Sequence, residues 1–306
     1  MDERTLTILR GRGWTPGETL GTGMEGTVVA LSSDVVAKVW HGRDRADLLS
    51  LVRFGAALGR SSVPFRTSRA LELLEGEGQP VTIEHRVHGR PVRLDNLVDP
   101  PIVSDKEARL MGDALAGLAR GIEPGLVVLP ILPGEPSFEN DSSFAVNLAD
   151  LTQWRLDAHS ALLRQKIGDI DELVGALLVR LRALPTVSPA SLIHGDLIPA
   201  NILVEDDEVT GVVDFGFMTT LGDPAFDAAI TASIFDMYGT NGRESERILS
   251  SVFLLRFGHD PMRYGLYRAA YAVITNSLFG VDDSDGHFLW CAAMLEREDV
   301  RNAILD

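Results

Sequence analysis

Three oxygen-bearing side chains lie within one short stretch of the sequence, "IHGDLIPANILVEDDEVTGVVDFG" at 193–216. Asp196 follows His-Gly, Asn201 comes after four intervening residues, and Asp214 opens Asp-Phe-Gly with twelve residues between it and Asn201. The two apolar runs around the polar turn predict a β-hairpin. Such a hairpin places Asn201 at the start of one strand and Asp214 at the end of the other, so that the two side chains can meet.

These three side chains have the chemistry of a phosphoryl-transfer site. An amide oxygen and a carboxylate are hard ligands suited to Mg²⁺, which completes its shell with phosphate and water. Asp196 could then accept a proton from a hydroxyl held beside that metal. In phosphoryl transfer the protein mainly positions groups and neutralises charge. Asp, Asn and Gly are also ordinary turn residues, but their joint spacing argues against that alternative.

A glycine-rich stretch near the N-terminus, "GTGMEGTV", contains Gly21, Gly23, Gly26 and Val28. Glycines there would let backbone amides approach phosphate oxygens. The pattern also fits a dinucleotide-binding turn or a simple hairpin, but a dinucleotide fold needs a helix directly after the glycines, and "TVVAL" continues as a strand. Lys38, inside the apolar strand "VVAKVW", is either a snorkelling edge residue or a buried cation that meets phosphate. The neighbouring motifs favour the buried cation.

Two lobes must position these residues. Residues 1–88 are predicted to be rich in strands, with one helix over 44–59, and form a nucleotide-binding lobe. Residues 89–306 are predicted to form a mainly helical lobe for catalysis and substrate binding, in which the strand–turn–strand segment 192–217 is the exception. The segment 104–122 opens with a capping box, Ser104 to Glu107. The expected fold class is α+β, with the boundary near His88–Pro91.

The charge, apolar runs and cysteine content of the chain limit the classes of partner and the cellular location that are expected. The chain has 306 residues with 28 basic and 44 acidic side chains, a formal net charge of −16, which argues against nucleic-acid binding. An acidic cleft would suit a cationic substrate, and a solubility-driven acidic surface is the alternative. No apolar run reaches the ~20 residues of a membrane span, and the first residues lack the pattern of a signal peptide. The single cysteine, Cys291, allows no internal disulfide, so a cytoplasmic location is expected.

The chain resembles the protein-kinase-like superfamily and, within it, the aminoglycoside phosphotransferase family of small-molecule kinases. The resemblance rests on "GTGMEGTV", "VVAKVW", "IHGDLIPANILV", "VVDFGF" and "GDPAFDAAI", which follow in this order over nearly the whole chain. Gly195 stands where protein kinases usually carry Arg. The segment "LGDPAFD" follows Asp-Phe-Gly at once, where a protein kinase would have a longer activation segment ending in Ala-Pro-Glu. Both features favour the small-molecule branch.

The resemblance implies a bilobal protein-kinase-like fold and a role for each motif residue. Asp196 would be the catalytic base or hydroxyl-orienting group, Asn201 and Asp214 would hold Mg²⁺, and Lys38 would contact the α- and β-phosphates. The nucleotide would also meet a further set of residues: Gly21, Gly23, Gly26 and Val28 over the triphosphate, Ile83 lining the base pocket, and backbone groups from Glu84 to Val87 at the base.

The resemblance also implies supporting roles. His194 would orient the turn rather than catalyse, and Asp227 would receive hydrogen bonds beneath the catalytic loop. The family usually pairs the strand lysine with a Glu on the following helix, but the only acids between Lys38 and Pro64 are Asp44 and Asp47. Asp47 is therefore the expected partner of Lys38.

The expected activity is transfer of the γ-phosphoryl group of ATP or GTP to a hydroxyl of a small molecule, first of all an aminoglycoside-type antibiotic. Macrolide, choline, homoserine and methylthioribose kinases of the same fold are the alternatives. A protein kinase is disfavoured by the missing Ala-Pro-Glu segment, and a pseudokinase by the presence of Lys38, Asp196 and Asp214. Carboxylates of the helical lobe that could meet a polyamine are Glu135, Glu139, Asp141, Asp157, Asp236, Asp282, Asp283 and Asp285. The sequence does not indicate an oligomeric state.

Overall fold

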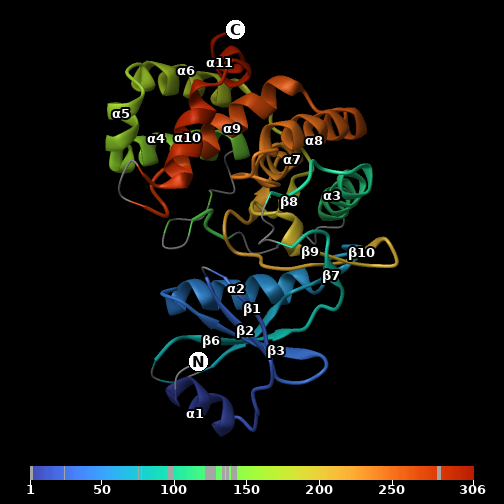
Figure 1. Ribbon diagram of the computed structural model, residues 1–306. Helices are drawn as coiled ribbons and strands as arrows, with labels where there is room; N and C mark the ends of the chain where they lie inside the picture. The colour runs from blue at the N-terminus through green and yellow to red at the C-terminus, as the bar shows by residue number, and fades with distance from the viewer. Residues whose placement is uncertain are drawn as a thin grey trace.

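The computed structural model of the chain describes residues 3–306 except 24, 75, 77, 95–98, 121–128, 133–134, 136–137, 139–142 and 281–283. A β-sheet lobe formed by the N-terminal residues lies against a larger helical lobe, with the hairpin of β9 (Ile202–Glu205) and β10 (Glu208–Val212) between them (Figure 1). The predicted α+β class and the division into a strand-rich and a helical region are confirmed. Among the described helices none is both long and apolar enough to cross a membrane.

The N-terminal lobe is built on a five-stranded antiparallel sheet in the order β1-β2-β3-β6-β5. The strands are β1 (Thr19–Thr22), β2 (Gly26–Ala30), β3 (Val35–Trp40), β5 (Ala70–Leu73) and β6 (Val81–His85). Lys38 lies opposite Val28 on one neighbouring strand and Thr82 on the other. Because directly opposed residues in a sheet project to the same side, these three side chains share one face, which we call the inner face.

Two helices cover opposite faces of this sheet (Figure 1). The first, α1 (Glu3–Gly11), was not predicted, since only one helix was expected in this lobe; its buried Leu9 joins Ala37, Val39 and Ile83 in a small core cluster on the outer face. The second, α2 (Arg45–Leu58), was predicted over 44–59. Its N-terminus is capped by Asp44, whose side chain accepts a hydrogen bond from the Ala46 N–H.

A second sheet joins the lobes. Its strand order is β4-β10-β9-β7, with bounds β4 (Arg66–Thr67), β7 (Arg90–Pro91), β9 (Ile202–Glu205) and β10 (Glu208–Val212). The β9–β10 hairpin is the predicted one. Its turn consists of Asp206 and Asp207, which both take left-handed backbone angles, φ 46° and 65°. Two successive left-handed residues match the twist of a two-residue hairpin turn. In this sheet the hairpin is flanked by β4 on one side and β7 on the other, and both strands come from before residue 92.

The helical lobe surrounds most of one large apolar core, which continues into the N-terminal lobe through residues such as Trp40 and Phe54. Its helices are α3 (Asp105–Leu118), α4 (Phe144–His159), α5 (Ala161–Lys166), α6 (Ile170–Ala183), α7 (Pro224–Ile234), α8 (Gly242–Phe257), α9 (Pro261–Thr275), α10 (Gly286–Glu296) and α11 (Glu298–Leu305). The capping box of Ser104 and Glu107 at α3 is confirmed. A two-stranded sheet of β8 (Ser191–Ile193) and β11 (Thr220–Gly222) lies beside the short 3-10 helix η1 (Pro199–Asn201).

Candidate active site

The loop between β8 and η1 is fixed from below by a buried carboxylate. Asp227, in the first turn of α7, accepts hydrogen bonds from the backbone N–H groups of His194 and Gly195, both at 2.9 Å. On the other side, the Thr219 hydroxyl donates to the His194 carbonyl at 2.9 Å. The contacts expected for Asp227 are therefore present. They leave the backbone of Asp196 little freedom.

The buried imidazole of His194 links this loop to the Asp-Phe-Gly segment. Its Nε2 lies 2.9 Å from the Val213 carbonyl oxygen, and its Nδ1 lies 3.3 Å from the backbone nitrogen of Asp196. A carbonyl only accepts and a backbone N–H only donates, so Nε2 carries the proton and Nδ1 does not. Burial lowers the pKa of His194 to about 4, which keeps the ring neutral and in this orientation.

Asn201 connects Asp196 with the strand that leads to Asp214. Its side-chain Nδ2 donates to the backbone carbonyl of Asp196 at 2.9 Å, and its backbone carbonyl accepts from the Val213 N–H at 2.9 Å. The amide nitrogen is thus committed, and the amide oxygen is the atom left to face a cation. Asp214 takes a left-handed backbone angle, φ 67°, and its N–H donates to Ser68 Oγ at 3.1 Å. The structure therefore brings these predicted residues together at one end of the hairpin.

Lys38 meets Asp214 across the lobes. The Lys38 Nζ lies 2.5 Å from Asp214 Oδ1. Burial alone would raise the pKa of Asp214, but the charge and hydrogen bond of Lys38 outweigh it and the pKa is lowered. Burial alone would lower the pKa of Lys38, but the charges of Asp214 and Glu25 outweigh it and the pKa is raised. Both groups are therefore ionised at neutral pH.

The donor set of Asn201 and Asp214 fits a magnesium ion. It offers one amide oxygen and one carboxylate, and Mg²⁺ is usually bound through one or two carboxylates together with substrate phosphates and water. The carboxylate of Asp214 is ionised even without a metal, because the positive charge of Lys38 stabilises the negative charge and lowers the pKa. Metal binding there thus requires no deprotonation step at neutral pH.

The second acidic partner of Lys38 is not the predicted one. Glu25, from the loop between β1 and β2, places Oε2 at 3.3 Å from Lys38 Nζ and Oε1 at 3.1 Å from Arg43 Nη1. The expected pairing with Asp47 or Asp44 is wrong. Asp44 is used as the cap of α2, and the short side chain of Asp47 in the first helical turn does not reach the lysine. Glu25 lies inside the glycine-rich stretch, where its charge was a signal that sequence reasoning missed.

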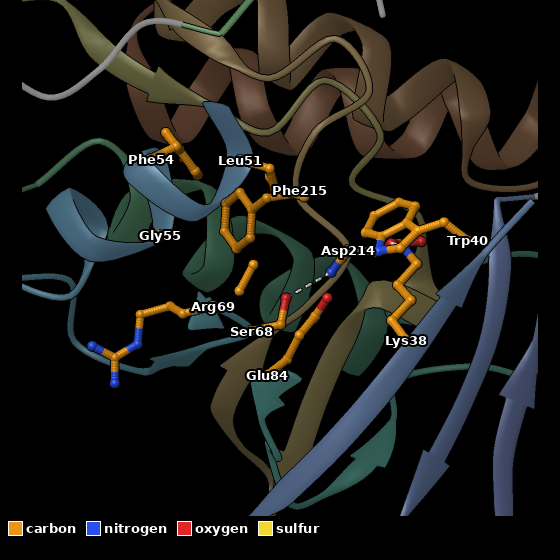
Figure 2. A pocket seen from close by; sticks show the side chains of 11 residues that line it. Lys38, Trp40, Leu51, Phe54, Gly55, Ser68, Arg69, Glu84, Asp214 and Phe215 are labelled. Atoms are coloured by element: carbon orange, nitrogen blue, oxygen red, sulfur yellow. Dashed lines mark hydrogen bonds and ion pairs between the residues drawn. The ribbon is translucent and has the colours of Figure 1, made fainter. Parts of the chain in front are cut away.

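A chain of polar contacts runs along the inner face behind Lys38. The Lys38 Nζ lies 3.9 Å from the centroid of the Trp40 ring, whose Nε1 donates to Thr82 Oγ1 at 2.8 Å. Thr82 in turn donates to Glu84 Oε1 at 2.6 Å. Burial raises the pKa of Glu84 more than the charge of Lys38 lowers it. Figure 2 shows Lys38, Trp40, Glu84 and Asp214 around one pocket, with the Ser68 hydroxyl bonded to the Asp214 backbone.

The position predicted for Ile83 is wrong. Ile83 lies opposite Ala37 on β3 and packs with Leu9 in the outer-face cluster. The inner face, where the nucleotide was expected, instead carries Glu84, which lies opposite Val36. Side chains alternate between the two faces of a strand. Val36 is two positions from Lys38 in β3, so the sequence places Val36, and not Ile83, on the same face as Lys38.

Backbone groups from Glu84 to Val87 were expected to contact the nucleotide base. One of them, the Arg86 N–H, donates to the Asp34 carbonyl at 2.9 Å. The side chain of Val87 packs against Gly211, so closely that a Cβ added to Gly211 would lie under 3.0 Å from the Val87 side chain.

The glycines of the β1–β2 loop differ in what the fold asks of them. A Cβ at Gly26 would lie under 3.0 Å from the Val39 carbonyl oxygen, so strand pairing itself excludes a side chain there. A Cβ at Gly21 or Gly23 would meet no atom of the described residues within 4 Å. Packing among the described residues therefore does not explain these two glycines. Open backbone of this kind can approach a ligand closely.

Comparison with protein families agrees with this geometry. The sequence model of the phosphotransferase enzyme family matches residues 17–263. The chain belongs to the phosphotransferase enzyme family. The resemblance drawn from the motifs is confirmed, and so is the prediction that the chain is a small-molecule kinase. Curated protein sequences contain no match to the chain.

Solved structures similar to this phosphotransferase share its fold at low sequence identity. The GDP complex of wild-type aminoglycoside 2'-phosphotransferase-IIIa has a TM-score of 0.64 and 16% identity, with 97% of each chain covered. A thermostable mutant of aminoglycoside phosphotransferase APH(4)-Ia has a TM-score of 0.63 and 13% identity, covering 98% of this chain and 99% of the other. Macrolide 2'-phosphotransferase type I has a TM-score of 0.60 and 16% identity, with 95% of each chain covered.

An aromatic group lies near the segment that follows Asp-Phe-Gly in this phosphotransferase, where the ring centroids of Phe279 and Phe217 are 6.4 Å apart. The exposed Tyr238 turns its hydroxyl to His287 Nδ1 at 3.1 Å, and the His287 ring lies 4.8 Å from Phe279 and 6.0 Å from Trp290 between centroids. Desolvation of its hydroxyl raises the pKa of Tyr238 to about 12. We call Tyr238, Phe279, His287 and Trp290 the aromatic group. Sequence analysis missed this group, because its members come from the loop after α7, the loop after α9, and α10.

The described acids proposed to meet a polyamine make different local contacts. Glu135 pairs with Arg155 at 3.4 Å, and Asp157 accepts from Gln153 at 3.0 Å. Asp285 caps α10, and one oxygen of Asp236 is buried without a hydrogen-bond partner among the described residues. Four of the predicted acids, Glu139, Asp141, Asp282 and Asp283, lie outside the described residues.

Proposed function

We propose that this phosphotransferase moves the γ-phosphoryl group of ATP or GTP to a hydroxyl of a small molecule. The observation that carries the proposal is the convergence of four motif residues from both lobes. Asn201 Nδ2 bonds the Asp196 carbonyl at 2.9 Å, and Lys38 Nζ lies 2.5 Å from Asp214 Oδ1. An acceptor-binding carboxylate, two hard oxygen ligands and a cation are what phosphoryl transfer requires at one point.

Each residue has one role in the proposed reaction. Asp196 orients the acceptor hydroxyl and accepts its proton, held in place by the bonds that His194, Asn201 and Asp227 make to its loop. Lys38 neutralises charge on the α- and β-phosphates. Asn201 and Asp214 would hold Mg²⁺, which when bound offsets charge on the triphosphate.

The nucleotide would lie under the β1–β2 loop on the inner face of the sheet. Gly21 and Gly23 offer backbone without side chains there, and Val28 shares the face of Lys38. The backbone from Glu84 to Val87 would meet the base. A cytoplasmic location belongs to the proposal, since the buried, unpaired Cys291 suits a reducing compartment where nucleoside triphosphates are available.

An aminoglycoside-type acceptor, and with it a role in antibiotic resistance, is the first candidate. Membership of the family and the net charge of −16 support it, because an acidic protein attracts a polycation.

A macrolide-type acceptor is the second candidate, and the aromatic group favours it. Tyr238 and Phe279 are 66% and 46% exposed, and Phe279 lies 6.4 Å from the ring of Phe217, which directly follows Asp-Phe-Gly. Exposed rings at that place stabilise an acceptor with a broad apolar face and few charges. A polycation would instead need several carboxylates at the same place.

The test is release of nucleoside diphosphate from Mg-ATP and Mg-GTP with a panel of aminoglycosides, macrolides and small hydroxylated metabolites. Turnover with an acceptor above the rate without one establishes the activity and selects the acceptor class. Asp196→Asn should lower kcat by about 10²–10⁴-fold, with little change in the Kd of the Mg-nucleotide. Asp206→Asn, in the exposed hairpin turn, is the matched control and should keep wild-type turnover. Near-normal turnover of Asp196→Asn would contradict the role of Asp196.

A further inference from the structure

The structure holds an anion of its own between two buried cations. The carboxylate of Glu25 bridges Lys38 Nζ at 3.3 Å and Arg43 Nη1 at 3.1 Å, one oxygen to each. The Lys38 and Arg43 side chains are each only 9% exposed. Two buried cations that share one multi-oxygen anion make the kind of contact through which proteins also bind phosphate.

Arg43 is held in place by groups other than Glu25. It lies between β3 and α2, where Nη2 donates to the Gly216 carbonyl at 3.4 Å and the guanidinium lies 5.2 Å from the centroid of the Trp40 ring. Gly216 belongs to the Asp-Phe-Gly segment. The Arg43 Nε is buried and has no hydrogen-bond partner in the part of the chain that the structure describes. The arginine is therefore positioned at the phosphate end of the site and keeps a buried donor unused.

Glu25, in contrast, is held at its site mainly by these two cations. Its side chain is 31% exposed, and its residue lies in the β1–β2 loop between Gly23 and Gly26. Its backbone carbonyl accepts from the His41 N–H at 2.8 Å, so the loop keeps its place when the side chain moves. Rotation of the side chain toward solvent would free both Lys38 and Arg43.

We propose that Glu25 occupies the place of a nucleotide phosphate in the nucleotide-free enzyme, and that Arg43 with Lys38 binds that phosphate once Glu25 has moved out. This rests on the proposed function, which makes a nucleoside polyphosphate the ligand of the site. Arg43 is then a phosphate-binding residue, and Glu25 is a competitor built into the loop that covers the phosphates. Nucleotide binding and movement of the Glu25 side chain are coupled, because the Glu25 carboxylate lies on the Lys38 and Arg43 nitrogens that the phosphate would contact.

A permanent pairing of Glu25 with Lys38 is the alternative. In that arrangement Glu25 replaces the helix glutamate that is missing from α2 and remains on the lysine when nucleotide binds. The two arrangements predict opposite effects of removing the charge of Glu25. If Glu25 is a competitor, its loss strengthens phosphate binding. If it is a permanent partner of Lys38, its loss weakens phosphate binding.

The experiment measures Kd by calorimetry for adenosine and for ADP with Mg²⁺, or for guanosine and GDP if the wild type prefers them. Glu25→Gln should bind the diphosphate about tenfold more tightly, because loss of one charge-assisted contact is worth this factor. The Kd of the nucleoside should not change. In the Glu25→Gln background, Arg43→Gln should weaken diphosphate binding by about tenfold or more. In the wild-type background Arg43→Gln should weaken diphosphate binding by a smaller factor, because it also removes one of the two ion pairs that hold Glu25 in the phosphate position.

Arg53→Gln, on the exposed side of α2, is the matched control and should leave every Kd unchanged. Weaker or unchanged diphosphate binding by Glu25→Gln overturns the competitor role. Unchanged diphosphate binding on adding Arg43→Gln to Glu25→Gln overturns the role of Arg43. A wild type that binds neither diphosphate overturns the proposed function itself, and this result is distinct from the other two because it is seen before any variant is made.

Discussion

At the scale of single residues, Asp227 shows how a group that touches no reactant can decide where the reacting carboxylate lies. Its two oxygens accept the N–H groups of His194 and Gly195, one each, directly before Asp196. Burial raises the pKa of Asp227 to about 6, although both hydrogen bonds favour its ionised form. The carboxylate is retained in this apolar place because the two N–H groups would otherwise be buried without acceptors.

Asp227→Ala is expected to leave both N–H groups unsatisfied. Each costs roughly 1–3 kcal/mol when buried without a partner, so the free energy of unfolding should fall by about 3 kcal/mol. Urea denaturation measures it. Asp227→Asn keeps one acceptor oxygen and should lose about half as much. A loss below about 0.5 kcal/mol for the alanine variant would contradict the assigned role.

At the scale of elements, the β8–η1 loop and the segment after Asp-Phe-Gly approach each other so closely that only glycine fits at 195. Gly195 has a left-handed backbone angle, φ 83°, and an added Cβ would lie under 3.0 Å from both the Cβ and the carbonyl oxygen of Met218. Met218 cannot easily retreat, because its N–H donates to the Ile131 carbonyl at 2.7 Å. The glycine that distinguishes this chain from protein kinases is thus required by packing.

Gly195→Ala is expected to destabilise the enzyme and to displace Asp196. The left-handed backbone costs ~1–2 kcal/mol for a residue with a side chain, and the overlap with Met218 costs a further ~1–3 kcal/mol. The midpoint of urea unfolding and kcat should both fall. For the control Gly21→Ala, where an added Cβ meets no atom of the described residues within 4 Å, the free energy of unfolding should stay within about 1 kcal/mol. Equal stabilities for the two variants would count against this account of Gly195.

At the scale of the whole molecule, buried titratable groups in several elements set how stability depends on pH. Burial lowers the pKa of both His194 and His287 to about 4. The unfolded state therefore binds more protons than the folded state between pH 6.5 and 4, and stability is lost as pH falls through this range. Asp227 acts in the opposite direction: its pKa is raised to about 6, so its contribution decreases as pH rises from 3.8 to 6.

From these groups, the free energy of unfolding is expected to fall by about 3 kcal/mol between pH 7 and pH 4. Each histidine contributes a loss of about 3 kcal/mol, and Asp227 offsets one of them. Chemical denaturation across this pH range measures the dependence. His287→Gln removes one histidine and should make the dependence nearly flat. A slope that His287→Gln does not reduce would show that His287 is not the source.

The sequence by itself determined the order of the motifs, the hairpin that brings Asn201 to Asp214, the extent of α2 and the capping box of α3. These features depend on contacts between residues near each other in the chain, on the two-residue alternation of strands and on turn chemistry. The short helix α1 was missed because its stability comes from Leu9 packing on the outer face of the sheet rather than from its own sequence.

Only the tertiary structure decided which charges meet. Lys38 lies against Asp214, 176 positions away, and shares Glu25 with Arg43, while the acids of α2 are turned to a cap and a helix surface. The aromatic group is likewise assembled from a helix and separate loops. Spacing along the chain specifies local backbone geometry, but the pairing of distant side chains depends on how the lobes and helices pack, which no local pattern records.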